Sequence, residues 1–166
     1  MRLYPIPFGF TVICTHFYTA CLEYPMTDDL NFEYILDAFS FLPDWESRYE
    51  FIEDLGKKMP IMDDANKIDE YRVHECMSIV WVKADTLDTH GIVQIEGDSD
   101  TSTIKGIVAI LYSIYRGMNP EQILETDTDA KFDLLGLFEH LSPTRHVGVY
   151  AIVEKIRRQA QGLLNS

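Results

Sequence analysis

Apolar residues at every second position mark two short segments in the middle of the chain. The first covers residues 78–85 and the second covers residues 93–96, with a turn-forming Asp-Thr-His-Gly sequence at residues 88–91 between them. A period of two is typical of half-buried strands. The pair is therefore predicted to form a β-hairpin, and Val73 is predicted to begin a third antiparallel strand beside it.

Apolar residues spaced three or four positions apart predict helices on both sides of the hairpin. These helices cover residues 28–39, 44–56, 104–115, 120–125 and 129–137 and the chain from Pro143 onward. Gly56 and Pro60 are expected to end the second helix, and the charged connector at residues 59–71 is expected to lie outside the core. Residues 104–115 carry few polar side chains and are predicted to form a buried central helix. The predicted fold class is α+β, with several helices packed against a small antiparallel sheet of about three strands.

Residues 1–25 differ from the rest of the chain. They contain prolines, aromatic residues and an apolar run at residues 8–13, which is too short for the roughly 20 apolar residues of a membrane span. Thr19-Ala20-Cys21 resembles a lipoprotein cleavage sequence, but the apolar segment before it is poor for a signal peptide. The preferred hypothesis is that Met26 is the natural start. Residues 1–25 are then a poorly structured extension, and residues 26–166 form a single domain.

Composition and charge limit the classes of partner. The chain has 166 residues, of which 46% are hydrophobic and 25% are charged, and this is typical of one soluble domain with a real core. Its formal net charge is −13. Nucleic acids and anionic membrane surfaces need clustered Lys and Arg, so both are excluded as expected partners. A protein or a small molecule is the predicted partner.

The cysteines argue against a disulfide framework or a zinc site. Cys14, Cys21 and Cys76 are odd in number, and their spacing fits no usual zinc motif. His74 and Cys76 together supply too few ligands for a metal. No Gly-rich nucleotide motif and no HExxH or CxxC motif is present. A reducing cytoplasm is the expected location, and no metal is expected.

Cys76 is the principal candidate for chemistry. It directly precedes the first predicted strand, and a thiol on a loop held by a rigid strand suits sulfur chemistry with a partner. The alternative is that Cys76 is a small core residue, because free cysteines are often buried. A Cys/His hydrolase is a further alternative, with His74 as the base, but no third group that would orient the base is evident.

Four segments, in this order, resemble the SufE family of cysteine desulfuration proteins. The resemblance covers about residues 28–161. The segments are Leu42-Pro43-Asp44-Trp45-Glu46 with Arg48-Tyr49 and Leu55-Gly56-Lys57, then Arg72-Val73-His74-Glu75-Cys76-Met77-Ser78 before Val80-Trp81, then Asp98-Ser99-Asp100 before Lys105-Gly106, and finally Leu137 with His140-Leu141-Ser142-Pro143-Thr144-Arg145.

The resemblance implies a function in iron–sulfur cluster assembly. SufE proteins stimulate a pyridoxal-phosphate-dependent cysteine desulfurase and accept its persulfide sulfur on a cysteine, which corresponds to Cys76. They then pass the sulfur to an iron–sulfur cluster scaffold. The implied partners are the desulfurase and the scaffold, and the implied protein has no cofactor of its own because the pyridoxal phosphate belongs to the desulfurase. Whether the protein is a monomer or a homodimer stays open.

Two residues beside Cys76 depart from the SufE motif, and three other residues are candidates for binding the partner. The family has glycine before the cysteine and glutamine after it, whereas this chain has Glu75 and Met77, and a neighbouring carboxylate is expected to disfavour the thiolate. His74, Asp100 and Arg145 are candidates for binding the partner, although Asp100 could equally cap a helix. A regulatory module that binds the desulfurase without carrying sulfur and a cysteine-dependent redox or hydrolytic enzyme are the alternative functions.

Overall fold

Two antiparallel strands, β1 (Val80–Leu87) and β2 (Val93–Ser99), form the sheet of the computed structural model, which describes residues 30–165. The side chains of Val80, Val82 and Ala84 are fully buried, as the alternation predicts. The paired register runs from Val80 opposite Ser99 to Leu87 opposite Val93, with an irregularity between Lys83 and Thr86. The α+β fold class is confirmed.

The prediction of a third strand is wrong. Residues near Val73 make only one isolated bridge to β1, between Arg72 and Trp81. The contact stops there because the amide of Cys76 turns back to the carbonyl of Val73 and carries the chain away from β1. Farther along the same edge, the side-chain amide of Gln159 accepts from the N–H of Ala84 and donates to the carbonyl of Val82.

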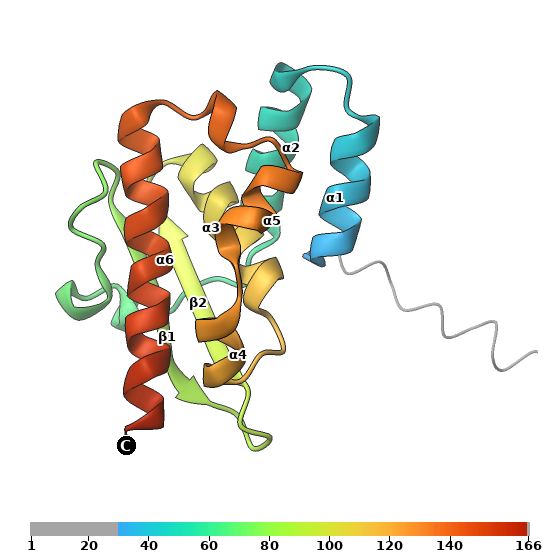
Figure 1. Ribbon diagram of the computed structural model, residues 1–166. Helices are drawn as coiled ribbons and strands as arrows, with labels where there is room; N and C mark the ends of the chain where they lie inside the picture. The colour runs from blue at the N-terminus through green and yellow to red at the C-terminus, as the bar shows by residue number, and fades with distance from the viewer. Residues whose placement is uncertain (1–29, 166) are drawn as a thin grey trace, which may run out of the picture.

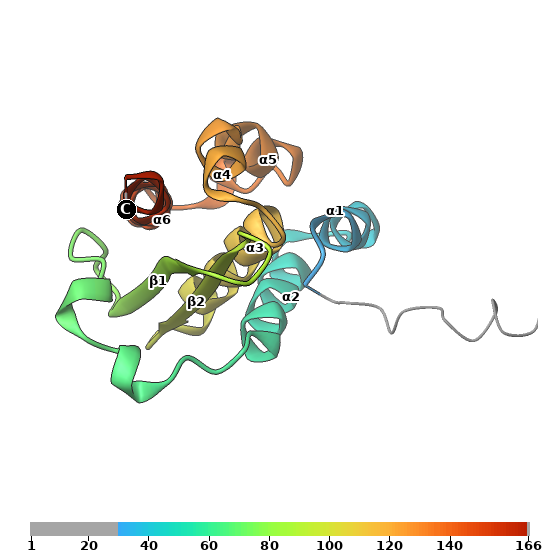
Figure 2. The same ribbon diagram turned by 90° about the horizontal axis from the view of Figure 1, so that it is seen from below.

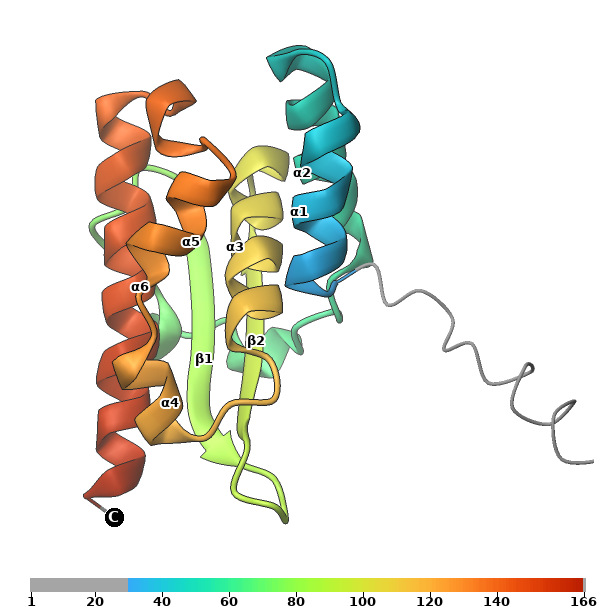
Figure 3. The ribbon, with the colours of Figure 1, turned by 45° about the vertical axis from the view of Figure 1, so that its right-hand side comes forward.

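Six α-helices lie within the described residues, and they form layers against one face of the sheet (Figure 1). The central helix, α3, packs against β2 and α2, whereas α6 packs against β1 and α4. Figure 3 shows α3 in the middle, with α1 and α2 on one side and α5 and α6 on the other. The bounds are α1 (Phe32–Phe41), α2 (Trp45–Lys58), α3 (Ser102–Tyr115), α4 (Pro120–Glu125), α5 (Thr128–Leu134) and α6 (Pro143–Leu164).

Two glycines allow α2 and α3 to cross with their backbones in contact. A Cβ atom on Gly106 would lie 2.1 Å from the carbonyl oxygen of Ile52, and one on Gly56 would lie 2.8 Å from the amide nitrogen of Gly106. The expectation that Gly56 ends its helix is therefore wrong, because Gly56 is buried inside α2. It serves the close approach of two helices rather than a C-cap.

The connector between α2 and β1 passes along the face of the sheet opposite the helices (Figure 2). It contains the short 3-10 helices η1 (Asp64–Asn66) and η2 (Asp69–Tyr71). The side chains of Met59 and Met62 are 4% and 1% exposed, so the expectation that this segment lies outside the core is wrong for both methionines. The connector is also joined to the sheet by polar contacts, from Asn66 to Glu96, from Lys67 to Asp98 and from Tyr71 to Asp85.

The other boundaries agree closely with the predictions. Helix α1 begins at Phe32, later than predicted, because Asn31 caps it by accepting from the amide of Glu33. The helix predicted over residues 129–137 ends earlier, as α5 at Leu134, and the 3-10 helix η3 (Phe138–His140) follows beyond the predicted range. The expectations for residues 1–25 and Met26 lie outside the described residues. Within residues 30–165, no helix is long and apolar enough to cross a membrane.

Candidate functional site

Residues 73–79 form a loop that runs beside the first half of α6 (Figure 1). Cys76 lies in this loop, next to Gly148 of α6. The amide of Val73 donates to the carbonyl of Val80 at 3.0 Å, and the amide of Cys76 donates to the carbonyl of Val73 at 3.4 Å. The first bond closes the base of the loop, and the second closes a tight turn over residues 73–76 within it. Cys76 is half-buried and lies against Gly148 of α6, so it is neither a core residue nor a freely exposed thiol.

A pocket of about 430 Å³ opens next to the Cys76 side chain. Three elements of the chain line it, namely the cysteine loop, the start of α3 and the start of α6. The lining residues are Cys76, Met77, Ser78, Thr101, Ile104, Ser142, Thr144 and Arg145. The pocket carries several hydroxyl groups and one guanidinium, and Ile104 is its lining residue from within α3.

The carboxylate of Asp100 holds the far end of the cysteine loop. Its Oδ1 accepts from the amide of Ile79 at 3.0 Å, and the amide of Asp100 donates to the carbonyl of Ile79 at 3.1 Å. The hydroxyl of Thr101 lies 3.0 Å from Ser78 Oγ and 3.1 Å from Asp100 Oδ1. Asp100 is therefore not the helix cap that the sequence allowed. Thr101 is the N-cap residue of α3, and Asp100 orders the loop.

The surroundings of Cys76 favour the protonated thiol. Burial raises the pKa of Cys76, the nearby N–H of Ser78 lowers it in part, and the negative charge of Asp100 raises it further. The sequence indicated Glu75 as the carboxylate that would act on the thiol. Glu75 is exposed. The carboxylate that raises the pKa of Cys76 is that of Asp100, which is distant in sequence and is brought near the thiol by the fold. The resting protein therefore carries a shielded thiol rather than a permanently activated thiolate.

The two other predicted residues differ in their relation to Cys76. Arg145 lies in the first turn of α6 and lines the same pocket, with its side chain exposed. His74 does not line this pocket, and its Nε2 lies 3.3 Å from Asp69 Oδ1 on the connector. The structure thus brings Arg145 and Asp100 to the cysteine loop and directs the imidazole of His74 toward the connector.

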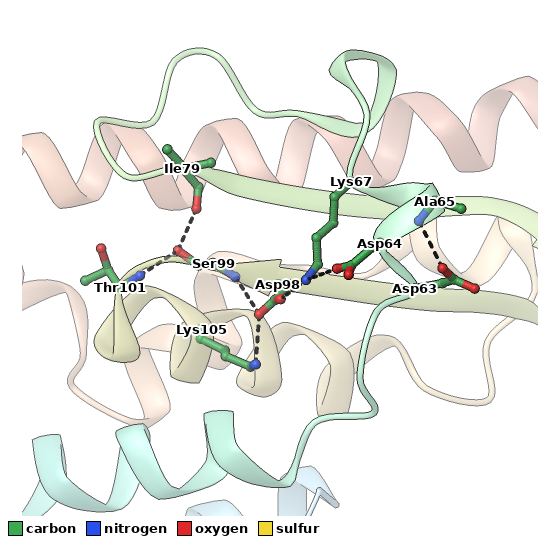
Figure 4. Close-up of polar contacts among 9 residues, drawn as sticks. All are labelled: Asp63, Asp64, Ala65, Lys67, Ile79, Asp98, Ser99, Thr101 and Lys105. Carbon is green, nitrogen blue, oxygen red and sulfur yellow. Dashed lines mark hydrogen bonds and ion pairs between the residues drawn. The ribbon is translucent and has the colours of Figure 1, made fainter.

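A network of ion pairs surrounds Asp98 near the end of β2, two residues before Asp100. Asp98 on β2 accepts from Lys105 of α3 at 2.8 Å and from Lys67 of the connector at 3.0 Å, and Lys67 also pairs with Asp64 at 2.8 Å (Figure 4). Burial raises the pKa of Asp98, but hydrogen bonds from Lys105, Lys67 and the amide of Ser99 together hold that pKa below its usual value. The network fixes the end of β2 that leads into Asp100.

Comparisons with known proteins show the family of the chain. The sequence model of SufE, described as an Fe–S metabolism associated domain, matches residues 33–160. The chain belongs to the SufE family. It is 35% identical over 136 residues to an uncharacterised SufE-like protein of Rhizobium meliloti strain 1021, covering 81% of this chain and 97% of that protein. The solution structure of a hypothetical protein from Thermus thermophilus matches with a TM-score of 0.66 and 26% identity, covering 81% of this chain and 96% of the other.

As a SufE domain, the described part of the chain is associated with iron–sulfur metabolism. The two departures from the SufE motif both lie at the surface. Glu75 is exposed, and the side chain of Met77 is 86% exposed while it also lines the pocket. Neither side chain fills space in the core, so both residues belong to the outer face of the site.

Sequence reasoning missed four residues of this candidate site. Thr101, Ser142 and Thr144 line the pocket, and Gly148 contacts the cysteine. The signal for Ser142 and Thr144 was their position next to Arg145 in the last motif. The signal for Gly148 was a glycine inside a helical pattern, which costs about 1 kcal/mol relative to alanine and therefore indicates a packing requirement.

Proposed function

We propose that the protein is a sulfur carrier whose Cys76 accepts sulfur from a pyridoxal-phosphate-dependent cysteine desulfurase. The thiolate of Cys76 attacks the outer sulfur of the persulfide on the desulfurase. The S–S bond of the donor breaks, a new S–S bond forms on Cys76, and the thiolate of the desulfurase leaves. No external oxidant or reductant is consumed. The carrier then delivers the outer sulfur to an iron–sulfur cluster scaffold.

The position of Cys76 at the edge of the pocket is the observation that carries this proposal. The thiol lies where a donor can reach it through the pocket, whereas the thiol itself is half-buried against α6. A second sulfur bound to Cys76 needs room beside the thiol and some shelter from oxidants and small thiols. The adjoining pocket of about 430 Å³ offers that room.

The raised pKa of Cys76 fits a carrier that acts only with its partner. Burial is the largest cause of the rise, so docking that moves the loop outward lowers the pKa and releases the thiolate. We assign three residues to this docking step, namely Arg145 of α6, His74 of the loop and Asp100, which holds the end of the loop. The carrier is proposed to use no metal or cofactor of its own and to work in the reducing cytoplasm, where a free thiol persists.

Intact-mass spectrometry tests the proposal. The full chain is incubated with a cysteine desulfurase, pyridoxal phosphate and L-cysteine, and the modified peptide is mapped because the chain also contains Cys14 and Cys21. We expect a reductant-labile gain of one sulfur atom, about 32 Da, on Cys76. No gain at Cys76 would contradict the proposal.

The Cys76→Ser variant separates the carrier from a regulator. A carrier loses both the mass gain and the stimulation of the desulfurase when its thiol is replaced. Stimulation that survives in Cys76→Ser would show that the protein regulates the desulfurase by binding alone. Turnover of a substrate without any desulfurase would instead indicate a cysteine-dependent enzyme.

A further inference from the structure

Gly148 of α6 and the sulfur atom of Cys76 occupy adjoining space. A Cβ atom built on Gly148 would lie 2.9 Å from Cys76 Sγ, 3.7 Å from its Cβ and 3.9 Å from its Cα. Carbon and sulfur atoms in ordinary contact lie farther apart than the first of these distances and close to the other two. Only the sulfur atom therefore depends on the absence of a side chain at position 148.

The pocket is lined by Cys76 and not by Gly148. Its lining includes Arg145 and Thr144, which precede Gly148 in α6, and Thr101 at the start of α3. The backbone of α6 thus closes the space behind the sulfur, and the pocket leaves space open beside it. A group added to Sγ can extend only away from Gly148.

We propose that Gly148 is a positioning residue that seats the resting Cys76 sulfur against α6 and directs the second sulfur into the pocket beside Arg145. The proposal rests on the proposed sulfur-carrier function for its second half, whereas the seat itself concerns the free thiol alone. Gly148 touches the carrier atom and takes no part in bond making or breaking. Its lack of a side chain determines how much of the thiol is shielded.

Alkylation of Cys76 in the Gly148→Ala variant tests the seat. The added methyl group displaces the sulfur outward, so we expect iodoacetamide to modify the Cys76 peptide roughly threefold faster or more at a fixed pH. The midpoint of the pH–rate profile should also move down, because burial is the largest cause of the raised pKa. Asp100 and Arg145 are the charged groups facing the thiol from neighbouring elements, and both are unchanged in this variant.

The matched control is Gly162→Ala on the same helix. A Cβ atom at Gly162 meets nothing within 4 Å, so this variant has the same gain in helix propensity without the contact. We expect its Cys76 to react at the rate of the unmodified chain. Equal rates and equal midpoints in Gly148→Ala, Gly162→Ala and the unmodified chain would overturn the seat.

If Gly148→Ala is too unstable for alkylation measurements, a double-mutant cycle with Cys76→Ala tests the same contact. In a Cys76→Ala background the sulfur atom is absent, and the nearest remaining atom is the Cβ at 3.7 Å. We expect Gly148→Ala to lower the urea midpoint when Cys76 is present and to leave it equal or higher when Cys76 is alanine. The same loss in both backgrounds would show a general packing role and would overturn the seat.

Sulfur loading tests the second part of the proposal, that the second sulfur is directed into the pocket. After loading by a desulfurase and L-cysteine, the persulfide of Gly148→Ala should be reduced by dithiothreitol several-fold faster than that of the unmodified chain. Equal reduction rates would overturn the direction assigned to the second sulfur. If the unmodified chain takes up no sulfur, the proposed function fails and the direction fails with it. The alkylation rates still decide whether the resting thiol is seated on Gly148.

Discussion

Asp100 and Ile79 exchange two hydrogen bonds that join the end of the cysteine loop to the start of α3. The side-chain Oδ1 of Asp100 accepts from the amide of Ile79 at 3.0 Å, and the amide of Asp100 donates to the carbonyl of Ile79 at 3.1 Å. Asp100 thereby bonds both the N–H and the carbonyl of Ile79, the last loop residue before β1. The position of Cys76 is tied through this pair to a helix that belongs to the core.

Replacing Asp100 by alanine should loosen the loop and make Cys76 more reactive. The variant loses the side-chain bond to Ile79, worth about 1 kcal/mol, and the negative charge that raises the pKa of the thiol. We expect faster alkylation of Cys76 at every pH. The Asp100→Asn control keeps an acceptor for Ile79 and should react more slowly than Asp100→Ala. The prediction fails if both variants match the unmodified chain.

The pH dependence of Cys76 alkylation should lie above that of an ordinary thiol. Burial holds the pKa of Cys76 above its usual value of 9.0, so the thiolate fraction and the alkylation rate keep rising at pH values where a free thiol has levelled off. The measurement is the rate of iodoacetamide modification of the Cys76 peptide between neutral and strongly alkaline pH. Free cysteine serves as the reference, and a midpoint at or below that of free cysteine would contradict the assignment.

A methyl group at the crossing of α2 and α3 should be strongly destabilising. In Gly106→Ala the new Cβ would lie 2.1 Å from the carbonyl oxygen of Ile52, so two helices of the core must separate. We expect a loss of about 3 kcal/mol in the free energy of unfolding, at the upper end for overpacked sites. Urea denaturation measures the loss. Gly162→Ala provides the comparison, since a stability equal to that of Gly106→Ala would show that the crossing is not tight.

Removing the charge of Asp98 should destabilise the protein at neutral pH and reduce its sensitivity to acid. The pKa of Asp98 in the folded protein is below the usual 3.8, so its stabilisation is present above that value and is lost as the pH falls through the folded-state pKa. Asp98→Asn should cost about 1–3 kcal/mol at pH 7, because Lys67 and Lys105 lose their charged acceptor. Urea midpoints measured from pH 7 down to about pH 3 check this. The difference between variant and unmodified chain should shrink at the acid end.

Arg145 should affect sulfur transfer without affecting stability. Its side chain is exposed and lines the pocket. Arg145→Ala should therefore unfold within about 0.5 kcal/mol of the unmodified chain, while the rate of sulfur loading on Cys76 falls. Arg145→Lys keeps the charge and should retain part of the rate. Loading of Arg145→Ala at the unmodified rate would exclude Arg145 from docking.

The sequence predicted those parts of the fold that depend on local pattern. The alternation through Val80, Val82 and Ala84 gave β1 its buried face, and Pro120 and Pro143 marked the first turns of two helices. These features depend on the period of the backbone and on the missing N–H of proline, which act over a few residues.

The contacts between distant segments could not be predicted in the same way. The sequence shows Gly56 and Gly106 as two separate glycines, and only the packing of α2 on α3 shows that each requires the other. Gly148 and Cys76 have the same relation across the loop and α6. Asp100 resembles a cap residue because caps are set by neighbouring positions, whereas its partner Ile79 is distant in sequence.

Gln159 protects the edge of β1 from pairing with a strand of another molecule. Its amide group holds the N–H of Ala84 and the carbonyl of Val82, which are the groups on β1 that an added strand would pair with. Because the amide projects from α6, intermolecular strand pairing along this edge requires that helix to be displaced first. The hairpin is thereby kept from pairing with a strand of a second molecule along the edge that adjoins the Cys76 loop.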